Sequence, residues 1–139
     1  MLNDTFPQLL PDGLPIESPL IWELSRFTIR NPSSKGDFAK ISAATAEMGL
    51  ALNQIGKLAG ISHYVAVYDA HMHRLLQRTG CAGDPISKPQ IIGGVRSYAV
   101  AYEVGDEWET LIQERLTINP SSSSINEQLV KEFRYSLAA

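Results

Sequence analysis

The stretch IWELSRF, residues 21–27, is mostly apolar yet carries both signs of charge. In a regular strand, Glu23 and Ser25 would point to one face of the sheet and Arg26 to the other. An ionised carboxylate in an apolar sheet is costly unless it is paired or hydrogen-bonded, and a bulge would bring Arg26 round toward Glu23. A partly desolvated glutamate can accept a proton near neutral pH. The residue types therefore allow either a general base at Glu23 or an idle ion pair on a sheet face.

Other reactive side chains lack the spacing of a metal site. His71 and His73 are two residues apart, so they do not share a helix face. His63 does not stand at a spacing that would make it a further metal ligand beside them. We therefore expect solvated or capping histidines and no metal. Cys81 is the single cysteine, so an internal disulfide is excluded, and it fits a small loop or core residue in a reducing compartment.

Arg74 and Arg78 are four residues apart on a predicted helix, so they share a face. Two adjacent guanidinium groups suit carboxylates or phosphates. An acidic partner could dock there, and a solvated polar face is the alternative.

Strands and helices alternate along the chain and must position these groups. A break at Gly60, an N-terminal cap at Asp69, a turn or bulge at Gly93-Gly94 and a cap at Asp106 separate them. Such alternation is typical of an α/β domain with helices packed on a sheet. The expected elements are strands at 20–29, 61–69 and 90–104 and helices at 38–60, 70–80 and 107–118.

The two ends of the chain are less regular. Residues 1–19 hold four prolines, which exclude a regular helix or a central strand, but their apolar side chains predict a packed, extended lead-in. The tail from Asn119 contains PSSSS and then a weak helical pattern. Because three strands make only a small sheet, we expect the second part of a larger domain.

Bulk composition is that of an ordinary globular protein. The chain has 139 residues, 44% hydrophobic and 19% charged, which is enough for one domain with a real core. A net charge of −3 does not favour nucleic acid or an anionic membrane surface as a partner. No apolar run approaches the length of a membrane span and no signal peptide is visible, so we expect a cytoplasmic protein without nucleic-acid or membrane partners.

Two of these segments together resemble the acyl-homoserine-lactone synthases, the autoinducer synthases of bacterial quorum sensing. MLNDTFPQLL has the family form M-L-x-x-x-F-P-x-L, and it leads into a strand with E-x-S-R-F. ISHYVAVYDAHMHRLLQRTG and PQIIGGVRSYAVAYEV also look like the family's second half. On this resemblance, residues 1–118 are the C-terminal portion of an autoinducer synthase domain, and 119–139 form a tail with a short helix as an option.

The resemblance implies an acetyltransferase-like α/β three-layer sandwich, incomplete at its N-terminal side. It also implies a reaction. The amine of S-adenosylmethionine attacks an acyl thioester on acyl carrier protein, and the product then lactonises and releases methylthioadenosine. S-adenosylmethionine is a substrate here, and no prosthetic group is implied.

Roles for individual residues follow from the same resemblance. Glu23 would be the base that deprotonates the amine, directly or through a water, with Arg26 orienting the site and Ser25 supporting its geometry. Tyr68 stands about where some members carry a small hydroxyl residue that reads the acyl 3-position. The matched positions for an acyl pocket are Val65, Val67 and Tyr68, and those for docking of the carrier protein are Arg74 and Arg78.

The family has a further N-terminal part that contributes to its S-adenosylmethionine site, and here Met1 matches an internal methionine. If the chain is complete, we expect poor or absent synthase activity and an exposed sheet edge. The alternative is a truncated, non-catalytic remnant that binds carrier protein or another subunit. A general acyl-CoA N-acyltransferase is disfavoured, because no glycine-rich pyrophosphate-binding loop is present.

Overall fold

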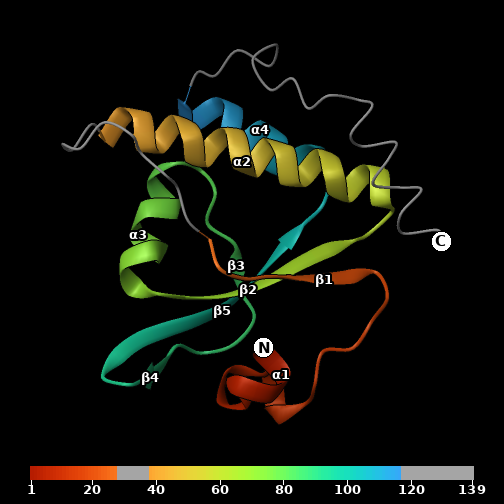
Figure 1. Ribbon diagram of the computed structural model, residues 1–139, viewed down its shortest axis with the longest axis vertical. Helices are drawn as coiled ribbons and strands as arrows, with labels where there is room; N and C mark the ends of the chain where they lie inside the picture. Colours follow the sequence, from red (N-terminus) through yellow and green to blue (C-terminus); the bar gives the residue numbers. More distant parts are fainter. Residues whose placement is uncertain (28–37, 117–139) are drawn as a thin grey trace.

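The computed structural model describes residues 1–27 and 38–116, so the expected loop at 31–37 and the tail from Asn119 lie outside the described residues. A mixed five-stranded sheet lies between helices on one face and the N-terminal segment on the other (Figure 1). The predicted α/β arrangement is therefore confirmed. The strands are β1 (Ile21–Leu24), β2 (His63–Asp69), β3 (Asp84–Pro85), β4 (Gln90–Ile92) and β5 (Val95–Glu103), and the helices are α1 (Leu2–Thr5), α2 (Phe38–Ala59), α3 (Ala70–Arg78) and α4 (Asp106–Leu116).

The sheet has the order β1-β2-β5-β3, and β4 also pairs with β5. β1 runs parallel to β2, while β5 is antiparallel to its three partners. Within the described residues, the outer edge of β1 pairs with no other strand.

Two predicted strands differ from the observed ones. The strand expected at 20–29 ends at Leu24, because Arg26 has a φ of 59°, in the left-handed region that does not continue a strand. The stretch expected at 90–104 is a hairpin, so of the turn or bulge expected at Gly93-Gly94 the structure has the turn. Gly93 and Gly94, with φ of 58° and 81°, form its two-residue turn, the connection for which positive φ values are required.

Helix ends follow the local signals more closely. The carboxylate of Asp69 accepts a hydrogen bond from the Met72 backbone N–H at 2.8 Å, as expected of an N-terminal cap. Asp106 is instead the first residue of α4, and its carboxylate lies 2.6 Å from the ammonium of Lys57. Lys57 lowers the pKa of Asp106, and Asp106 with Glu109 raises that of Lys57.

The two faces of the sheet carry separate apolar clusters. Along β2, Tyr64 and Ala66 point toward α2 and α4, while Val65 points toward the N-terminal segment. This is the period-two alternation of a strand buried on both faces. The helix-side cluster centres on Ala46, Leu50, Tyr64, Val100, Tyr102 and Ile112, and the opposite cluster on Leu2, Leu9, Leu10, Val65 and Ala99.

The proline-rich lead-in covers that second face. It contains one four-residue helical turn, α1, and two short 3₁₀ turns at Pro7–Leu9 and Pro11–Gly13, so it is less extended than predicted. The side-chain amide of Asn3 ties it together, donating to the Ile16 carbonyl at 2.9 Å and accepting from the Ile16 N–H at 3.0 Å. The prediction that this segment is packed is confirmed.

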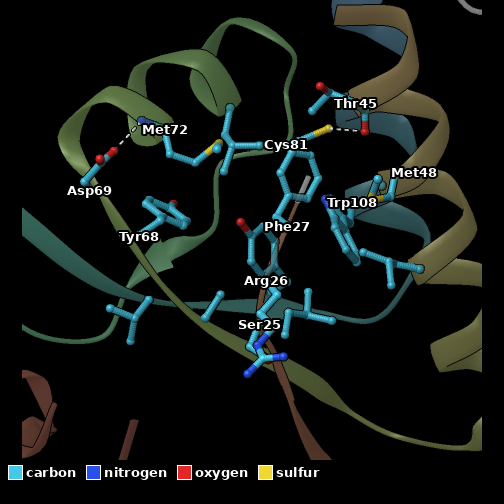
Figure 2. A pocket seen from close by; sticks show the side chains of 17 residues that line it. Ser25, Arg26, Phe27, Thr45, Met48, Tyr68, Asp69, Met72, Cys81 and Trp108 are labelled. Atoms are coloured by element: carbon cyan, nitrogen blue, oxygen red, sulfur yellow. Dashed lines mark hydrogen bonds between the residues drawn. The ribbon is translucent and has the colours of Figure 1, made fainter. Parts of the chain in front are cut away.

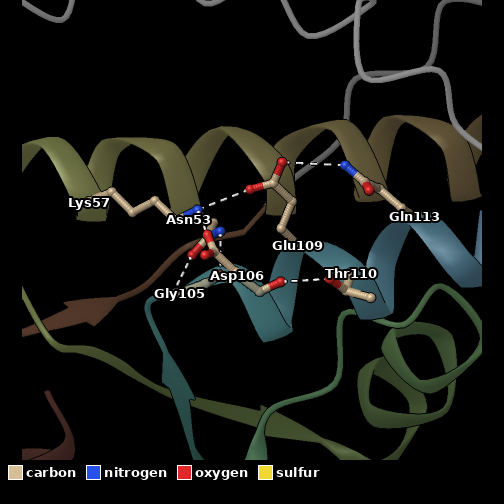
Figure 3. Close-up of polar contacts among 7 residues, drawn as sticks. All are labelled: Asn53, Lys57, Gly105, Asp106, Glu109, Thr110 and Gln113. Atoms are coloured by element: carbon tan, nitrogen blue, oxygen red, sulfur yellow. Dashed lines mark hydrogen bonds and ion pairs between the residues drawn. The ribbon is translucent and has the colours of Figure 1, made fainter.

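A polar clamp joins α2 to the loop before α4 (Figure 3). Asn53 is 1% exposed, and its amide donates to the Gly105 carbonyl and accepts from the Gly105 N–H, both at 2.9 Å. A buried amide that satisfies both backbone groups of one residue fixes the distance between the two elements. Because α2 and α4 together form the helical layer, this clamp also holds the walls of the cavity described below.

Replacing Asn53 with alanine is expected to destabilise the protein by about 2–4 kcal/mol, because two hydrogen bonds are lost and Gly105 keeps unpaired groups. The measurement is the free energy of unfolding in urea, followed by circular dichroism. Gln54→Ala is the matched control, since Gln54 is the exposed neighbour on the same helix. Equal effects of the two substitutions would contradict the clamp.

Candidate active site

A cavity opens where two parallel strands separate. β1 and β2 pair in register from Ile21 opposite His63 to Leu24 opposite Ala66. Beyond that point β2 continues to Asp69, while the chain after Leu24 turns away from it. The carboxyl ends of neighbouring parallel strands are a common position for ligand sites in α/β proteins. A cavity of about 450 Å³ lies at this divergence.

The cavity wall is mainly apolar, with charge at the strand ends (Figure 2). Arg26 follows β1 and Asp69 ends β2, and these are the charged groups among the described lining residues. Asp69 is already engaged as the cap of α3. Such a site suits a ligand that has a polar reacting group and an apolar tail. The apolar lining includes Phe27, Met48, Leu52, Met72, Leu76 and Trp108.

Ionisable groups in the apolar wall stay neutral at ordinary pH. Burial raises the pKa of the Cys81 thiol, of the Tyr68 phenol and, most strongly, of the Tyr102 phenol. The described wall therefore offers neither a thiolate nor a phenolate as nucleophile.

Glu23 lies on the other face of β1 from the cavity. Its carboxylate accepts hydrogen bonds from the amino group of Met1 at 2.9 Å and from the Leu2 N–H at 3.1 Å, and its side chain is 28% exposed. Ser25 and Arg26 instead line the cavity. The expected strand alternation fails after Leu24 because the strand has ended, so Ser25 and Arg26 reach the same site.

Only some of the predicted acyl-pocket residues line the cavity. Val67 and Tyr68 line the cavity. Val65 is not among the lining residues and is buried against the N-terminal segment, so its part in an acyl pocket stays a prediction. The Tyr68 hydroxyl lies 3.2 Å from Nδ1 of His73, whose ring stacks on Tyr98 with centroids 4.3 Å apart.

The family resemblance implies that the central helix helps to line the acyl pocket, but sequence reasoning named none of the helix-borne wall residues. Met48 and Leu52 on α2, like Met72 and Leu76 on α3, are four residues apart and so share a helix face. That spacing predicts burial but does not distinguish core from cavity. For Trp108 on α4, the sequence carries no signal that would place it in a site.

Arg74 and Arg78 are exposed on α3, as their spacing predicts. They line an open groove of about 480 Å³ together with Gln77 and Leu111, a leucine of α4 that is 52% exposed. The groove combines positive charge with an apolar contact. The role of Arg74 and Arg78 in docking stays a prediction.

Groups of three or more potential metal ligands are absent from residues 1–27 and 38–116. Across the same ranges we find no helix whose length and hydropathy would let it span a membrane.

Comparison with known proteins gives a consistent set of relatives. The sequence model of the family described as autoinducer synthase matches residues 1–112. An acyl-homoserine-lactone synthase of Ralstonia nicotianae is 34% identical over 95 residues, which cover 68% of this chain and 47% of the relative. One from Pseudomonas aeruginosa is 30% identical over 125 residues, covering 86% and 61%. The chain thus spans about half the length of the curated relatives it matches.

Solved structures agree on the fold. The CoA-dependent acyl-homoserine lactone synthase BjaI, with MTA, superposes with a TM-score of 0.64 at 20% identity, over 85% of this chain and 53% of that one. TofI in an apo form gives a TM-score of 0.61 at 23% identity, over 87% and 60%. These likenesses confirm the predicted acetyltransferase-like sandwich, of which this chain forms about half.

Proposed function

Because the chain belongs to the autoinducer synthase family, we propose that its cavity is part of the reacting centre of an acyl-homoserine-lactone synthase. The observation that carries the proposal is the mainly apolar cavity at the diverging ends of β1 and β2, with Arg26 in its wall. An acyl chain fits the apolar part, and a thioester carbonyl would lie near the strand ends. We place the reaction in the cytoplasm, where a free cysteine such as Cys81 stays reduced.

The chemistry requires a base but no prosthetic group. The amine nitrogen of S-adenosylmethionine attacks the thioester carbon, the carbon–sulfur bond breaks, and the donor leaves as a thiol. The methionine carboxylate then attacks its own γ-carbon, the carbon–sulfonium bond breaks, and methylthioadenosine leaves. Only a neutral amine can attack, so its proton must first pass to a base.

Glu23 is our candidate for that base, and its position suggests how the substrates are arranged. It projects from β1 on the face opposite the cavity, next to Leu2, whereas Arg26 lies in the cavity wall. We infer that the amine approaches from the Glu23 face while the acyl chain occupies the cavity. The two substrates would then meet at the end of β1, with Arg26 and Ser25 orienting the reacting groups.

Acyl carrier protein is the acyl donor that we propose. Its acidic surface is electrostatically complementary to the groove that Arg74 and Arg78 line. Acyl-CoA is the competing donor, since two of the structurally similar proteins, BjaI and MesI, are named as CoA-dependent synthases. The exposed Leu111 beside the two arginines favours a protein partner, because it supplies an apolar contact in a charged groove.

The test compares hexanoyl-acyl carrier protein with hexanoyl-CoA as donors. Because the chain spans about half the length of its relatives, the assay uses the complete polypeptide that its gene encodes. Mass spectrometry detects hexanoyl-homoserine lactone and methylthioadenosine. Arg74→Glu with Arg78→Glu is expected to raise the carrier-protein KM by about tenfold or more, since it reverses the local charge.

The matched control is Lys88→Glu with Arg96→Glu, two exposed cations reversed elsewhere on the surface. It should leave the carrier-protein KM unchanged. An equal rise in both double variants would show that only net charge matters. Arginine-dependent binding of the carrier protein without any lactone would instead support the non-catalytic remnant.

A further inference from the structure

The indole N–H of Trp108 is a buried donor without an acceptor. Trp108 is 7% exposed, and its Nε1 has no hydrogen-bond partner among the residues that the structure describes. The ring is held in place by Tyr102, with centroids 5.0 Å apart, and by Tyr64, at 6.3 Å. Buried tryptophan N–H groups usually find a partner, because leaving one unpaired costs free energy. An orphaned donor on a fixed ring therefore calls for a ligand acceptor.

This donor belongs to the wall of the acyl cavity. Trp108 lines it from α4, and Figure 2 shows the indole nitrogen on the side of the ring that faces Phe27. Two other donors of the apolar wall already have partners, whereas Ser25 and Arg26 lie at the strand end. The Tyr68 hydroxyl contacts His73 Nδ1 at 3.2 Å, and the Cys81 thiol contacts the Thr45 carbonyl at 3.8 Å. Trp108 thus presents an unused N–H to a largely apolar space.

We propose that Trp108 donates a hydrogen bond to an oxygen carried on the acyl chain, so that oxo- or hydroxyacyl groups are preferred over unsubstituted ones. This inference rests on the proposed function and names its substrate class. Tryptophan can only donate, so the chain must supply an acceptor, as a ketone or hydroxyl oxygen does. An unsubstituted chain would bury the N–H unpaired, and sites built to hydrogen-bond a ligand discriminate against analogues that lack the group.

The test measures binding and does not depend on turnover. N-(3-oxohexanoyl)-, N-(3-hydroxyhexanoyl)- and N-hexanoyl-homoserine lactone are titrated calorimetrically into the protein and into Trp108→Phe. We expect the native protein to bind at least one oxygenated compound about tenfold more tightly than the hexanoyl compound. Trp108→Phe keeps an aromatic six-membered ring but removes the pyrrole ring with its N–H, so it should abolish the preference for the oxygenated compounds whatever its effect on hexanoyl binding. Trp22→Phe, the same substitution at a partly buried tryptophan outside the cavity wall, should keep it.

A second measurement reads the N–H directly in the native protein. The ¹⁵N-indole resonance of Trp108, assigned by its loss in Trp108→Phe, should move downfield with the preferred oxygenated compound and little with the hexanoyl one. A preference that persists in Trp108→Phe, or an absent preference in the native protein, overturns the role of Trp108 and leaves the acyl site standing. If none of the three compounds binds, the acyl site and this inference fail together.

Discussion

Glu23→Gln is expected to lower lactone formation by about 100- to 10,000-fold, the range typical for loss of a general base. Glutamine has nearly the shape of glutamate but cannot take the proton of the amine. The measurement is kcat for hexanoyl-homoserine lactone, with acyl carrier protein as donor and the complete gene product as enzyme. Glu17→Gln is the matched control, because it makes the same change at an exposed residue of the N-terminal segment. Unchanged turnover would remove Glu23 as the base.

A structural role for Glu23 predicts a different pattern. Its carboxylate accepts N–H groups of Met1 and Leu2, so the substitution could act by loosening the N-terminal segment. Urea unfolding of Glu23→Gln separates the two roles. Loss of turnover with nearly unchanged unfolding free energy supports the base. Loss of both in parallel would mean that Glu23 mainly positions the segment.

The elements that carry local signals were predictable from sequence. α2 begins at Phe38 as expected and ends at Ala59, next to the predicted stop at Gly60. The cap at Asp69 likewise marks where α3 begins. Glycine stops and aspartate caps act within one helical turn, so a single sequence reveals them. The end of β1 was not predictable, because nothing in the residue type announces the left-handed conformation of Arg26.

The candidate site was predictable only in part, for a reason of geometry. Strand alternation correctly separates Val65 from Tyr64 and Ala66, but a sequence does not say which face of a doubly buried strand meets a cavity. The sequence therefore could not show that Val65 packs against the N-terminal segment. Trp108 became visible only through its burial and its unpaired N–H, which depend on tertiary packing. Motif resemblance identified the strand, and the fold decided which of its residues share a space.

The N-terminal segment supplies much of the apolar cluster on the sheet face opposite the helices. Leu9 is fully buried and packs in one cluster with Leu2, Leu10, Val65 and Ala99, so the lead-in seals the sheet face on which Glu23 lies. We expect Leu9→Ala to lower the free energy of unfolding by about 2–5 kcal/mol, through lost apolar burial and the cavity left behind.

Leu14→Ala makes the same substitution five positions along that segment, at a residue that is 66% exposed. Its expected effect is within about 0.5 kcal/mol, because surface truncations remove little buried area. The measurement is the free energy of unfolding of both variants in urea. Similar small effects would mean that the lead-in rests loosely on the sheet, and then the contact between Leu2 and Glu23 could not hold the proposed base in place. A large effect confined to Leu9 would tie the stability of the domain to the segment that positions its candidate catalytic residue.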